Sequence, residues 1–398
     1  MPATNTATRY GSVTKGFHWL TALLIVTVIP LGIFAHDAPF ATDAELSRKA
    51  LLFSLHKTVG VTIFFTALAR IVWALTQTKP AGLHPERRAE TFLADTVHWL
   101  LYASLVLVPL TGWIHHAAST GFAPIFWPFG QSLPFVPKDE SLSATFATLH
   151  FLFERVMVLS IVLHVAGALK HHLVDKDVTL LRMWFGTTTG GMAGPKHGLL
   201  PLLGAAGVYA IALGIGTSLG FFAPHNDEPA PTALTQVASD WTVQDGTLSI
   251  TVTQFGSPVT GTFADWTAAI TFDESATQDA GEVTVTIAIN SLTLGSVTDQ
   301  AMGADFFDAA THPTATFTAP ITRNAEAYSA NGTLTLKGAS APVALPFALV
   351  LEDDTATMTA AITLDRRTFG IGDNMPEENN LGFAVDVNIA LTATRTTQ

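Results

Sequence analysis

Two histidines lie within one long apolar stretch of this chain, between Thr145 and Val174. His150 and His164 are 14 residues apart, a spacing that comes within about 40° of four full helical turns. Both side chains therefore fall on nearly one face of a helix, about 21 Å apart along its axis. Titratable side chains are costly at membrane depth and usually mark function there. The pair predicts ligands for two stacked groups; the alternative is two buried histidines hydrogen-bonded to neighbouring helices.

The elements that must position these histidines are apolar segments of membrane-spanning length. Only 13% of the residues are charged, which is typical of a membrane protein. Each of five segments is long enough to cross about 30 Å of hydrocarbon. They are Phe17–Ala35, Leu51–Leu75, Phe92–His115, Leu149–Leu173 and Leu199–Phe222.

The basic residues of the connections predict the orientation, because Lys and Arg favour the cytoplasmic side. The amino terminus, the second connection and the fourth connection are the most basic. They contain Arg9, Lys15, Lys79, Arg87, Arg88, Lys170, Lys176, Arg182 and Lys196. The first connection has Arg48 and Lys49, and the third has Lys138. We therefore expect a cytoplasmic amino terminus and, after five spans, everything beyond Phe222 on the opposite side. The first segment could be mistaken for a cleaved signal peptide. We expect it to be retained, because His18 at its start completes a set of four paired histidines.

In this arrangement, histidines on different helices lie in pairs at the same depth in the membrane. His18 lies level with His164, and His56 lies level with His150. Two imidazoles that face each other from separate helices are what axial ligation of a b-type haem requires. Zinc is the rival, although it prefers four ligands with carboxylate or thiolate help. His98 competes for the place of His18, and a structural or interfacial role is expected for the other candidates, which are His115, His116, His171 and His172.

Cysteine content and charge exclude several classes of function. The chain has no cysteine, which excludes disulfides, thiolate-held iron–sulfur clusters and covalently attached c-type haem. Residues 1–222 carry a net charge of +4 and residues 223–398 carry −16. The acidic half would repel phosphates, so we expect no nucleic-acid partner.

The second half has the alternating pattern of β-strands. After a Pro-containing linker at 223–234, eight stretches alternate or nearly alternate apolar and polar residues, with Gly, Asn and Asp at the breaks. We expect one antiparallel barrel or sandwich, with a short helix within TDQAMGADFFDAATHP. Eight apolar side chains are candidates to line a cavity, and the alternative is that they fill a solid core. They are Phe255, Phe263, Trp266, Ile270, Phe306, Phe307, Phe317 and Phe347.

The first half resembles the bacterial cytochrome b561 family over residues 8–186. The resemblance rests on GFHWLTALLIV, LHKTVGVTIFFTALARIVW, DTVHWLLYASLVLVPLTGW and the run from LHFLFERV to DVTLLRM. It implies a four-helix membrane protein with two b haems that exchanges electrons with quinone, and some members oxidise superoxide at the periplasmic face and reduce ubiquinone. It also implies axial ligation by His18, His56, His150 and His164.

The second half resembles the YceI-like family over about residues 235–396. The matching stretches are GTFADWTAAITFD, GADFFDAATHPTATFTAP, NGTLTLKGASAPVALPFALV and TLDRRTFGIG. The resemblance implies a periplasmic, eight-stranded, lipocalin-like barrel that encloses an isoprenoid such as a ubiquinone tail. The chain departs from the family in a shortened turn at FGSPVTG and in having a membrane span, not a cleavable signal, before the barrel.

We therefore expect a multidomain protein of the bacterial inner membrane. It consists of an all-α four-helix di-haem bundle (8–186), a tethering transmembrane helix (199–222), the linker (223–234) and an all-β eight-stranded antiparallel barrel (235–398). The expected cofactors are two haem b groups, the partners are membrane lipid, quinone and superoxide or another donor, and no catalytic residue is assigned. The favoured reaction is superoxide oxidation with ubiquinone reduction. The alternatives are an electron shuttle serving a dehydrogenase or hydrogenase, and a polyisoprenoid carrier with a haem-containing anchor.

Overall fold

The computed structural model describes residues 2–84, 86–121, 123–184, 198–223, 234, 239–324 and 327–396. The chain forms two compact units. The helical unit comprises Met1–Ala38, Leu51–Ala118 and Ile125–Pro224. The barrel unit comprises Pro39–Ala50, Ser119–Pro124 and His225–Gln398. Most of the expected linker, together with Lys196, lies outside the described residues.

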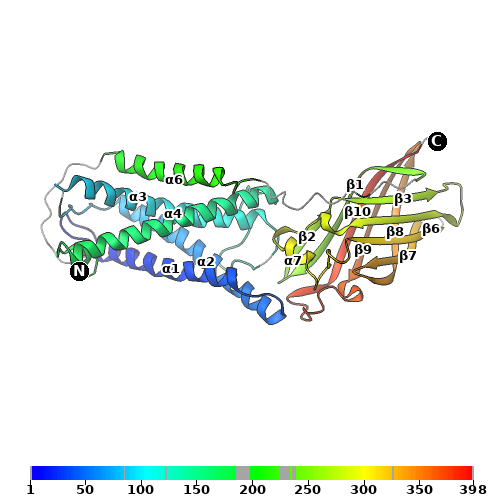
Figure 1. Cartoon of the computed structure of the whole chain (residues 1–398), viewed down its shortest axis with the longest axis horizontal. Coiled ribbons are helices and arrows are strands. Elements are labelled where there is room, and N and C mark those ends of the chain that lie inside the picture. Colours follow the sequence, from blue (N-terminus) through cyan, green and yellow to red (C-terminus); the bar gives the residue numbers. More distant parts are fainter. Residues whose placement is uncertain are drawn as a thin grey trace. The chain divides into compact units, whose positions relative to one another are not determined.

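Five helices of the described residues are long and apolar enough to span a membrane, as predicted. They are α1 (Ser12–Asp37), α2 (Asp43–Leu75), α3 (Arg88–Ala118), α4 (Glu140–Leu173) and α6 (Leu200–Ser218). The long helices run side by side (Figure 1), and a short helix, α5 (Thr179–Trp184), follows α4. The outward faces of the long helices are apolar; Leu23, Val26 and Val72, for example, are each more than 60% exposed. Apolar side chains on the outside are expected where lipid is the solvent.

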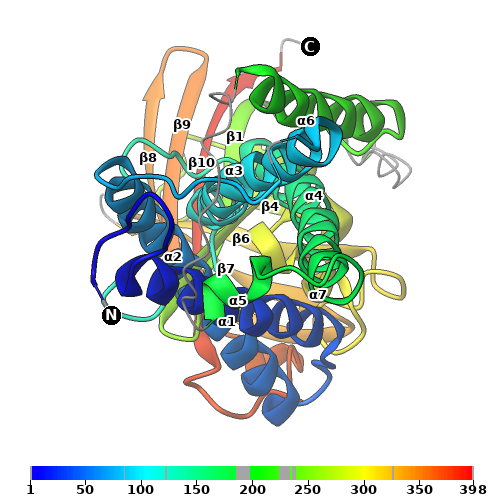
Figure 2. The same cartoon turned by 90° about the vertical axis from the view of Figure 1, so that its left-hand side faces the viewer.

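The fifth long helix is packed against the bundle. Ala205 of α6 is buried in a cluster with Leu100 of α3 and Val156 of α4. The Tyr209 hydroxyl lies 2.7 Å from Ser104 Oγ and donates to the Leu100 carbonyl. Figure 2 shows α6 alongside α3 and α4. Small residues and interhelical hydrogen bonds of this kind hold membrane helices together.

The second half is a single curled antiparallel sheet. Among the described residues it contains ten strands, in the order β3-β4-β6-β7-β8-β9-β10-β1-β2-β5. The strands are β1 (Trp241–Gln254), β2 (Ser257–Phe263), β3 (Trp266–Phe272), β4 (Asp279–Ala288), β5 (Leu292–Thr293), β6 (Thr314–Asn324), β7 (Ala327–Leu336), β8 (Ala339–Glu352), β9 (Thr355–Asp365) and β10 (Leu381–Arg395). The predicted short helix is α7 (Thr298–Met302). This confirms the expected combination of a helical membrane unit and a lipocalin-like barrel.

One expected strand proves to be two. The stretch from Gly261 to Asp273 breaks after Phe263, so that β2 pairs with β1 and β3 pairs with β4. The curl brings β3 back towards β1, where Gly246 leaves room for the Trp266 ring. A Cβ at Gly246 would lie 2.7 Å from that ring, so no larger residue fits there without displacing the tryptophan.

Candidate functional site

His56 of α2 and His150 of α4 face each other within the helical unit. Their ring centroids are 6.4 Å apart and the ring planes are nearly perpendicular, at 86°. His56 Nδ1 lies 2.9 Å from the Val28 carbonyl, and His150 Nδ1 lies 2.8 Å from the Val108 carbonyl. A carbonyl can only accept, so Nδ1 carries the proton on both rings. Each Nε2 is then left unprotonated, which is the form that binds a metal.

Two glycines allow these rings to approach the helix backbone. Gly32 is four residues after Val28 on α1, and Gly112 is four residues after Val108 on α3. A Cβ at Gly32 would lie 2.8 Å from the His56 ring, and a Cβ at Gly112 would lie 2.8 Å from His150 Nδ1. Any side chain at either position would therefore collide with the imidazole. The same device, a carbonyl that accepts and a glycine that makes room, occurs on both sides of the pair.

His18 of α1 and His164 of α4 form a second pair. Their ring centroids are 6.1 Å apart, with a 57° angle between the planes. His98 of α3 is also close to His164, at 5.2 Å. The structure therefore brings together both predicted pairs and also the predicted competitor.

The geometry of both pairs fits the axial ligation of a haem iron. Metal–imidazole bonds of about 2 Å on each side of a metal, added to the size of the rings, require centroids about 6 Å apart. The separations of 6.4 and 6.1 Å meet that requirement. At 5.2 Å, His98 is closer to His164 than that separation. The prepared Nδ1–H groups of His56 and His150 supply the hydrogen bonds that orient such ligands.

Cationic and imidazole groups gather around the His56–His150 pair. Lys57 is only 6% exposed and interacts electrostatically with His56, His115 and His116. The rings of His115 and His116 are 4.4 Å apart, and Ser143 lies 2.9 Å from His115 through both its hydroxyl and its carbonyl. These contacts give His115 a structural partner of its own.

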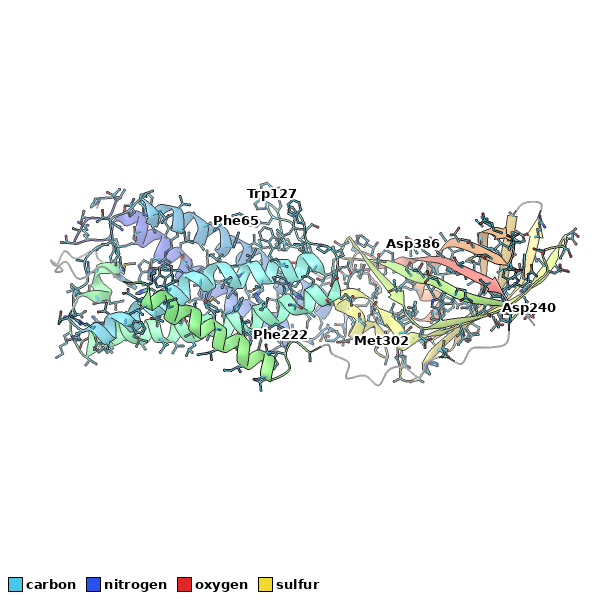
Figure 3. All side chains as sticks on the ribbon, turned by 90° about the horizontal axis from the view of Figure 1, so that it is seen from above. Phe65, Trp127, Phe222, Asp240, Met302 and Asp386 are labelled. Carbon is cyan, nitrogen blue, oxygen red and sulfur yellow. The ribbon has the colours of Figure 1, made fainter. Side chains whose placement is uncertain are left out.

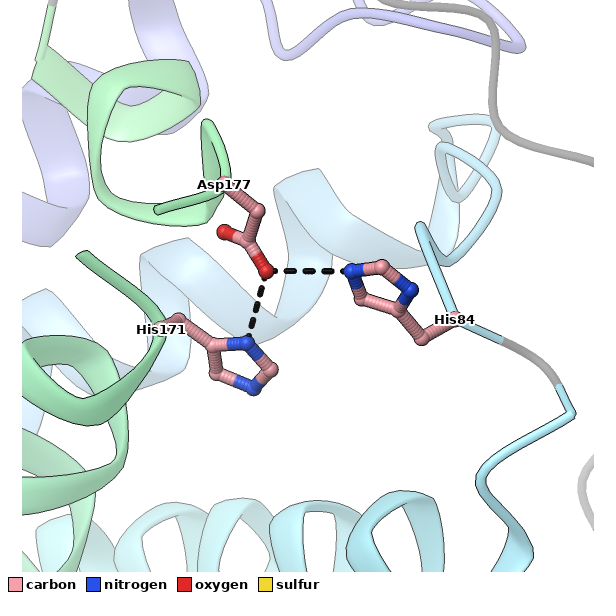
Figure 4. Close-up of side chains that lie close together, drawn as sticks. All are labelled: His84, His171 and Asp177. Atoms are coloured by element: carbon pink, nitrogen blue, oxygen red, sulfur yellow. Dashed lines mark hydrogen bonds and ion pairs between the residues drawn. The ribbon is translucent and has the colours of Figure 1, made fainter. Parts of the chain in front are cut away.

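A third histidine cluster lies where α4 ends. Asp177 Oδ2 accepts from His171 Nδ1 at 2.7 Å and from His84 Nε2 at 3.1 Å (Figure 4), and the two rings are parallel, 6.2 Å apart. Burial alone would raise the pKa of Asp177, but hydrogen bonds from Thr179 and His171 lower it to about 2.

His84, His171 and Asp177 could together hold a metal ion. The neighbouring carboxylates, however, already form ion pairs, Asp175 with Lys170 and Arg87, and Glu90 with Lys170. We call His84, His171 and Asp177 the α4 clamp, because they join the α2–α3 connection to the end of α4.

The barrel encloses an apolar cavity of about 300 Å³. Seven of the eight predicted side chains line it, namely Phe263, Trp266, Ile270, Phe306, Phe307, Phe317 and Phe347. Phe255 is not among the lining residues; it lies in the β1–β2 turn with φ +47° and packs near Leu46, Met375 and Leu381. Leu46, of the Pro39–Ala50 segment, does line the cavity.

Sequence reasoning missed several residues that shape these sites. The inward register of β1 runs Leu248, Ile250, Val252, Gln254, so the polar residue at its end was a visible signal. Gly32 and Gly112 had only a weak signal, since glycines are frequent in membrane helices. Nothing local indicated the contact between Asp177 and His84, because 93 residues separate them.

Comparison with known proteins finds a family match for each half of the chain. Residues 9–186 match the model of the family described as prokaryotic cytochrome b561. The chain is 30% identical over 184 residues to cytochrome b561 homolog 2 of Escherichia coli (strain K12), which covers 46% of this chain and 95% of that protein. The chain belongs to the prokaryotic cytochrome b561 family. Membership makes it a membrane electron-transfer protein that binds haem b.

A further relative of this cytochrome b561 carries a more specific name. The probable superoxide oxidase CybB of Yersinia pestis is 27% identical over 178 residues, covering 44% of this chain and 95% of that protein.

The second half of the chain has matches of its own. Residues 241–393 match the model of the YceI-like domain. Among solved structures, Burkholderia cenocepacia BcnA is 28% identical with a TM-score of 0.36, covering 37% of this chain and 96% of that chain. The Campylobacter jejuni YceI protein is 20% identical with a TM-score of 0.30, covering 44% and 95%.

Proposed function

We propose that this cytochrome b561 uses two b haems to oxidise superoxide at the periplasmic face of the inner membrane and to reduce ubiquinone. Two superoxide anions each lose one electron to give two molecules of oxygen. One ubiquinone takes up those two electrons and two protons to give ubiquinol. The barrel, on the same periplasmic side, binds the isoprenoid tail of the quinone.

The observation that carries this proposal is the pair of matched imidazole arrangements. His56 with His150, and His18 with His164, present facing rings at 6.4 and 6.1 Å from separate helices. Because α4 supplies one histidine to each, the pairs stand about 21 Å apart along that helix. Bound haems supply one-electron redox chemistry. The chain supplies ligands, spacing and a surrounding that excludes water.

The choice of an anionic donor is supported by the charge around His56 and His150. Lys57, next to His56 on α2, is buried. Lys138 lies just before α4, and its Nζ donates to the Ala117 carbonyl near the end of α3 at 2.9 Å. A lysine attracts small anions and raises their rate of encounter while its ammonium group is protonated. We infer that Lys57 attracts superoxide to the haem held by this pair.

The acceptor is supported by the barrel cavity. Its lining is almost entirely apolar, and burial of an isoprenoid tail there is favourable by about 0.8 kcal/mol per CH₂ at most. A binder tethered to the reductase raises the effective concentration of its ligand, so even weak binding is used repeatedly.

The test is superoxide-driven reduction of haem in the purified protein, followed by absorbance with and without ubiquinone. We expect rapid reduction, and reoxidation when quinone is present. Lys57→Gln should slow reduction by superoxide about tenfold and weaken its dependence on salt. Arg48→Gln, which removes an exposed charge from the same helix, is the control and should behave as wild type. Wild-type haem that superoxide leaves oxidised, yet another donor reduces, would replace the proposal with an electron shuttle.

A further inference from the structure

The cavity of the barrel has very few polar groups, and they are unevenly distributed. Almost all of its lining is apolar. The polar exceptions are Gln254, Gln300 and Arg366, together with the indole nitrogen of Trp241. In a site of this kind, a few placed polar groups fix the orientation of a ligand.

Gln254 ends the inward-facing row of β1. It follows the apolar side chains of Leu248, Ile250 and Val252 in the same register, and it is only 5% exposed. Its Oε1 is buried and has no hydrogen-bond partner. Buried acceptors without a partner are rare because they lose their hydration without compensation.

Gln300 brings a buried donor to the same end of the barrel. It belongs to α7, and its Nε2 has no hydrogen-bond partner. The next residue, Ala301, packs in one cluster with Val259, and Val252 packs against that cluster. Val252 and Val259 are paired across β1 and β2, two residues before Gln254. Figure 1 accordingly shows α7 beside β2.

Arg366 builds this end of the cavity and is fully engaged in doing so. It is 3% exposed, and its guanidinium donates to five backbone carbonyls. These belong to Ile371, Gly372, Met375, Leu381 and Gly382. The arginine therefore fixes the loop between β9 and β10, beside Gln254, whose cross-strand partner is Leu381.

The opposite end offers a single unpaired polar atom among the described lining residues. Trp241 begins β1, and its Nε1 is buried without a partner. A strand from Trp241 to Gln254 extends at most about 44 Å. Figure 3 shows Asp240, which precedes Trp241, and Met302, which ends α7, towards opposite ends of the barrel.

We propose that Gln254 and Gln300 form a subsite for the head group of an isoprenoid that carries a hydroxyl. Gln254 Oε1 accepts from the hydroxyl hydrogen, and Gln300 Nε2 donates to a head-group oxygen. The tail then extends towards Trp241. This inference rests on the proposed function, in which the barrel binds an isoprenoid tail.

The chemistry of the two amides has a consequence for quinones. A quinol has hydroxyls that both donate and accept, whereas a quinone has only accepting oxygens. A quinone leaves Gln254 Oε1 without a partner, and a site with an unpaired buried group discriminates strongly against such a ligand. The tail of either form is buried in the same cavity, and the subsite adds a preference for the reduced product over the oxidised substrate, so the barrel withdraws quinol after the reduction.

The experiment compares ligands that share a tail and have no redox chemistry. Geranylgeraniol offers a hydroxyl, and its methyl ether offers only an accepting oxygen. Binding of each to the full-length protein in detergent is measured by native mass spectrometry. We expect the wild type to bind the alcohol about tenfold more tightly than the ether. Gln254→Met should bind both as weakly as the wild type binds the ether.

Two variants serve as controls, with melting temperatures recorded for all. Gln244→Met places the same change on the exposed face of β1 and should keep the preference for the alcohol. Trp241→Phe removes the donor at the opposite end and should keep it as well. Tail binding without preference for the alcohol would overturn the subsite and leave the proposed lipid function standing. Loss of the preference in Trp241→Phe but not in Gln254→Met would overturn the orientation. Failure of both ligands to bind would overturn the lipid function itself.

Discussion

At the scale of single residues, backbone carbonyls set the protonation of the haem-ligand candidates. The Val28 and Val108 carbonyls accept from His56 and His150 at 2.9 and 2.8 Å. An imidazole held through Nδ1 is fixed in orientation and presents Nε2 to a metal. The glycines at 32 and 112 are part of this arrangement, because they set how closely each ring approaches the carbonyl.

The first prediction concerns Gly112. Gly112→Ala places a Cβ 2.8 Å from His150 Nδ1, which should displace the ring and weaken its bond to Val108. We expect a shifted midpoint potential for one haem and a partial loss of that haem, measured by optical redox titration and pyridine haemochrome counts. Gly60→Ala is the control, since nothing lies within 4 Å of a Cβ there. An unchanged potential in Gly112→Ala would mean that this packing does not position His150.

The second prediction concerns the four proposed ligands. His56→Ala or His150→Ala should remove one haem and largely spare the other, and His18→Ala or His164→Ala should do the reverse. The reason is that each pair joins different helices at one level. Haem counts per protein provide the measurement. The assignment of His18 is wrong if His98→Ala loses a haem while His18→Ala keeps both.

At the scale of elements, periodicity predicted where helices and strands lie, and packing decided how they are used. All five spans were predictable because a run of about twenty mostly apolar residues matches the thickness of a bilayer and exceeds the length of an ordinary strand. The packing of α6 against α3 and α4 was not, because Ala205 and Tyr209 look like any other residues of an apolar helix. The break between β2 and β3 was also missed, although Phe263 and Trp266 both line the cavity and, at three residues apart, cannot lie on one face of a single strand. The expected depth of each histidine along its span was enough to predict both histidine pairs. The unpaired atoms of Gln254 and Gln300 could not be predicted, because they are a property of tertiary packing.

The third prediction concerns the α4 clamp. Asp177→Asn removes the charge that accepts from His84 and His171, and should lower the thermal midpoint of the helical unit at pH 7 by about 2–4 °C. The folded pKa of Asp177 is about 2, below its ordinary value of 3.8. Its contribution is therefore present above about pH 4 and is lost as the pH falls from about 4 to 2. The difference between variant and wild type should shrink over that range.

A matched control for the clamp lies at the other end of α4. Asp139 caps the helix by accepting from the Leu142 amide at 2.8 Å, and asparagine caps equally well. Asp139→Asn should therefore leave the midpoint unchanged at pH 7. Equal losses in both variants would indicate a general effect of charge and not the clamp.

At the scale of the whole molecule, the number of spans decides on which side the barrel lies. The fourth prediction is that a reporter fused after Gln398 is active only if it works in the periplasm. The reason is that the five candidate spans are expected to place the most basic connections in the cytoplasm. Activity of a cytoplasmic reporter at that position would contradict the proposed topology, and a fusion at the α2–α3 connection, expected in the cytoplasm, serves as the control.

The α4 clamp also limits the rotation of α4 about its own axis. Because α4 contributes one histidine to each pair, a rotation of this helix about its axis moves both rings at once and in the same sense. Side-chain tips lie about 5–6 Å from a helix axis, so a turn of about 10° shifts them sideways by about 1 Å. Ligand geometry tolerates about half of that. The clamp holds α4 at its end, only seven residues beyond His164, and should make the two sites lose alignment together when it is released.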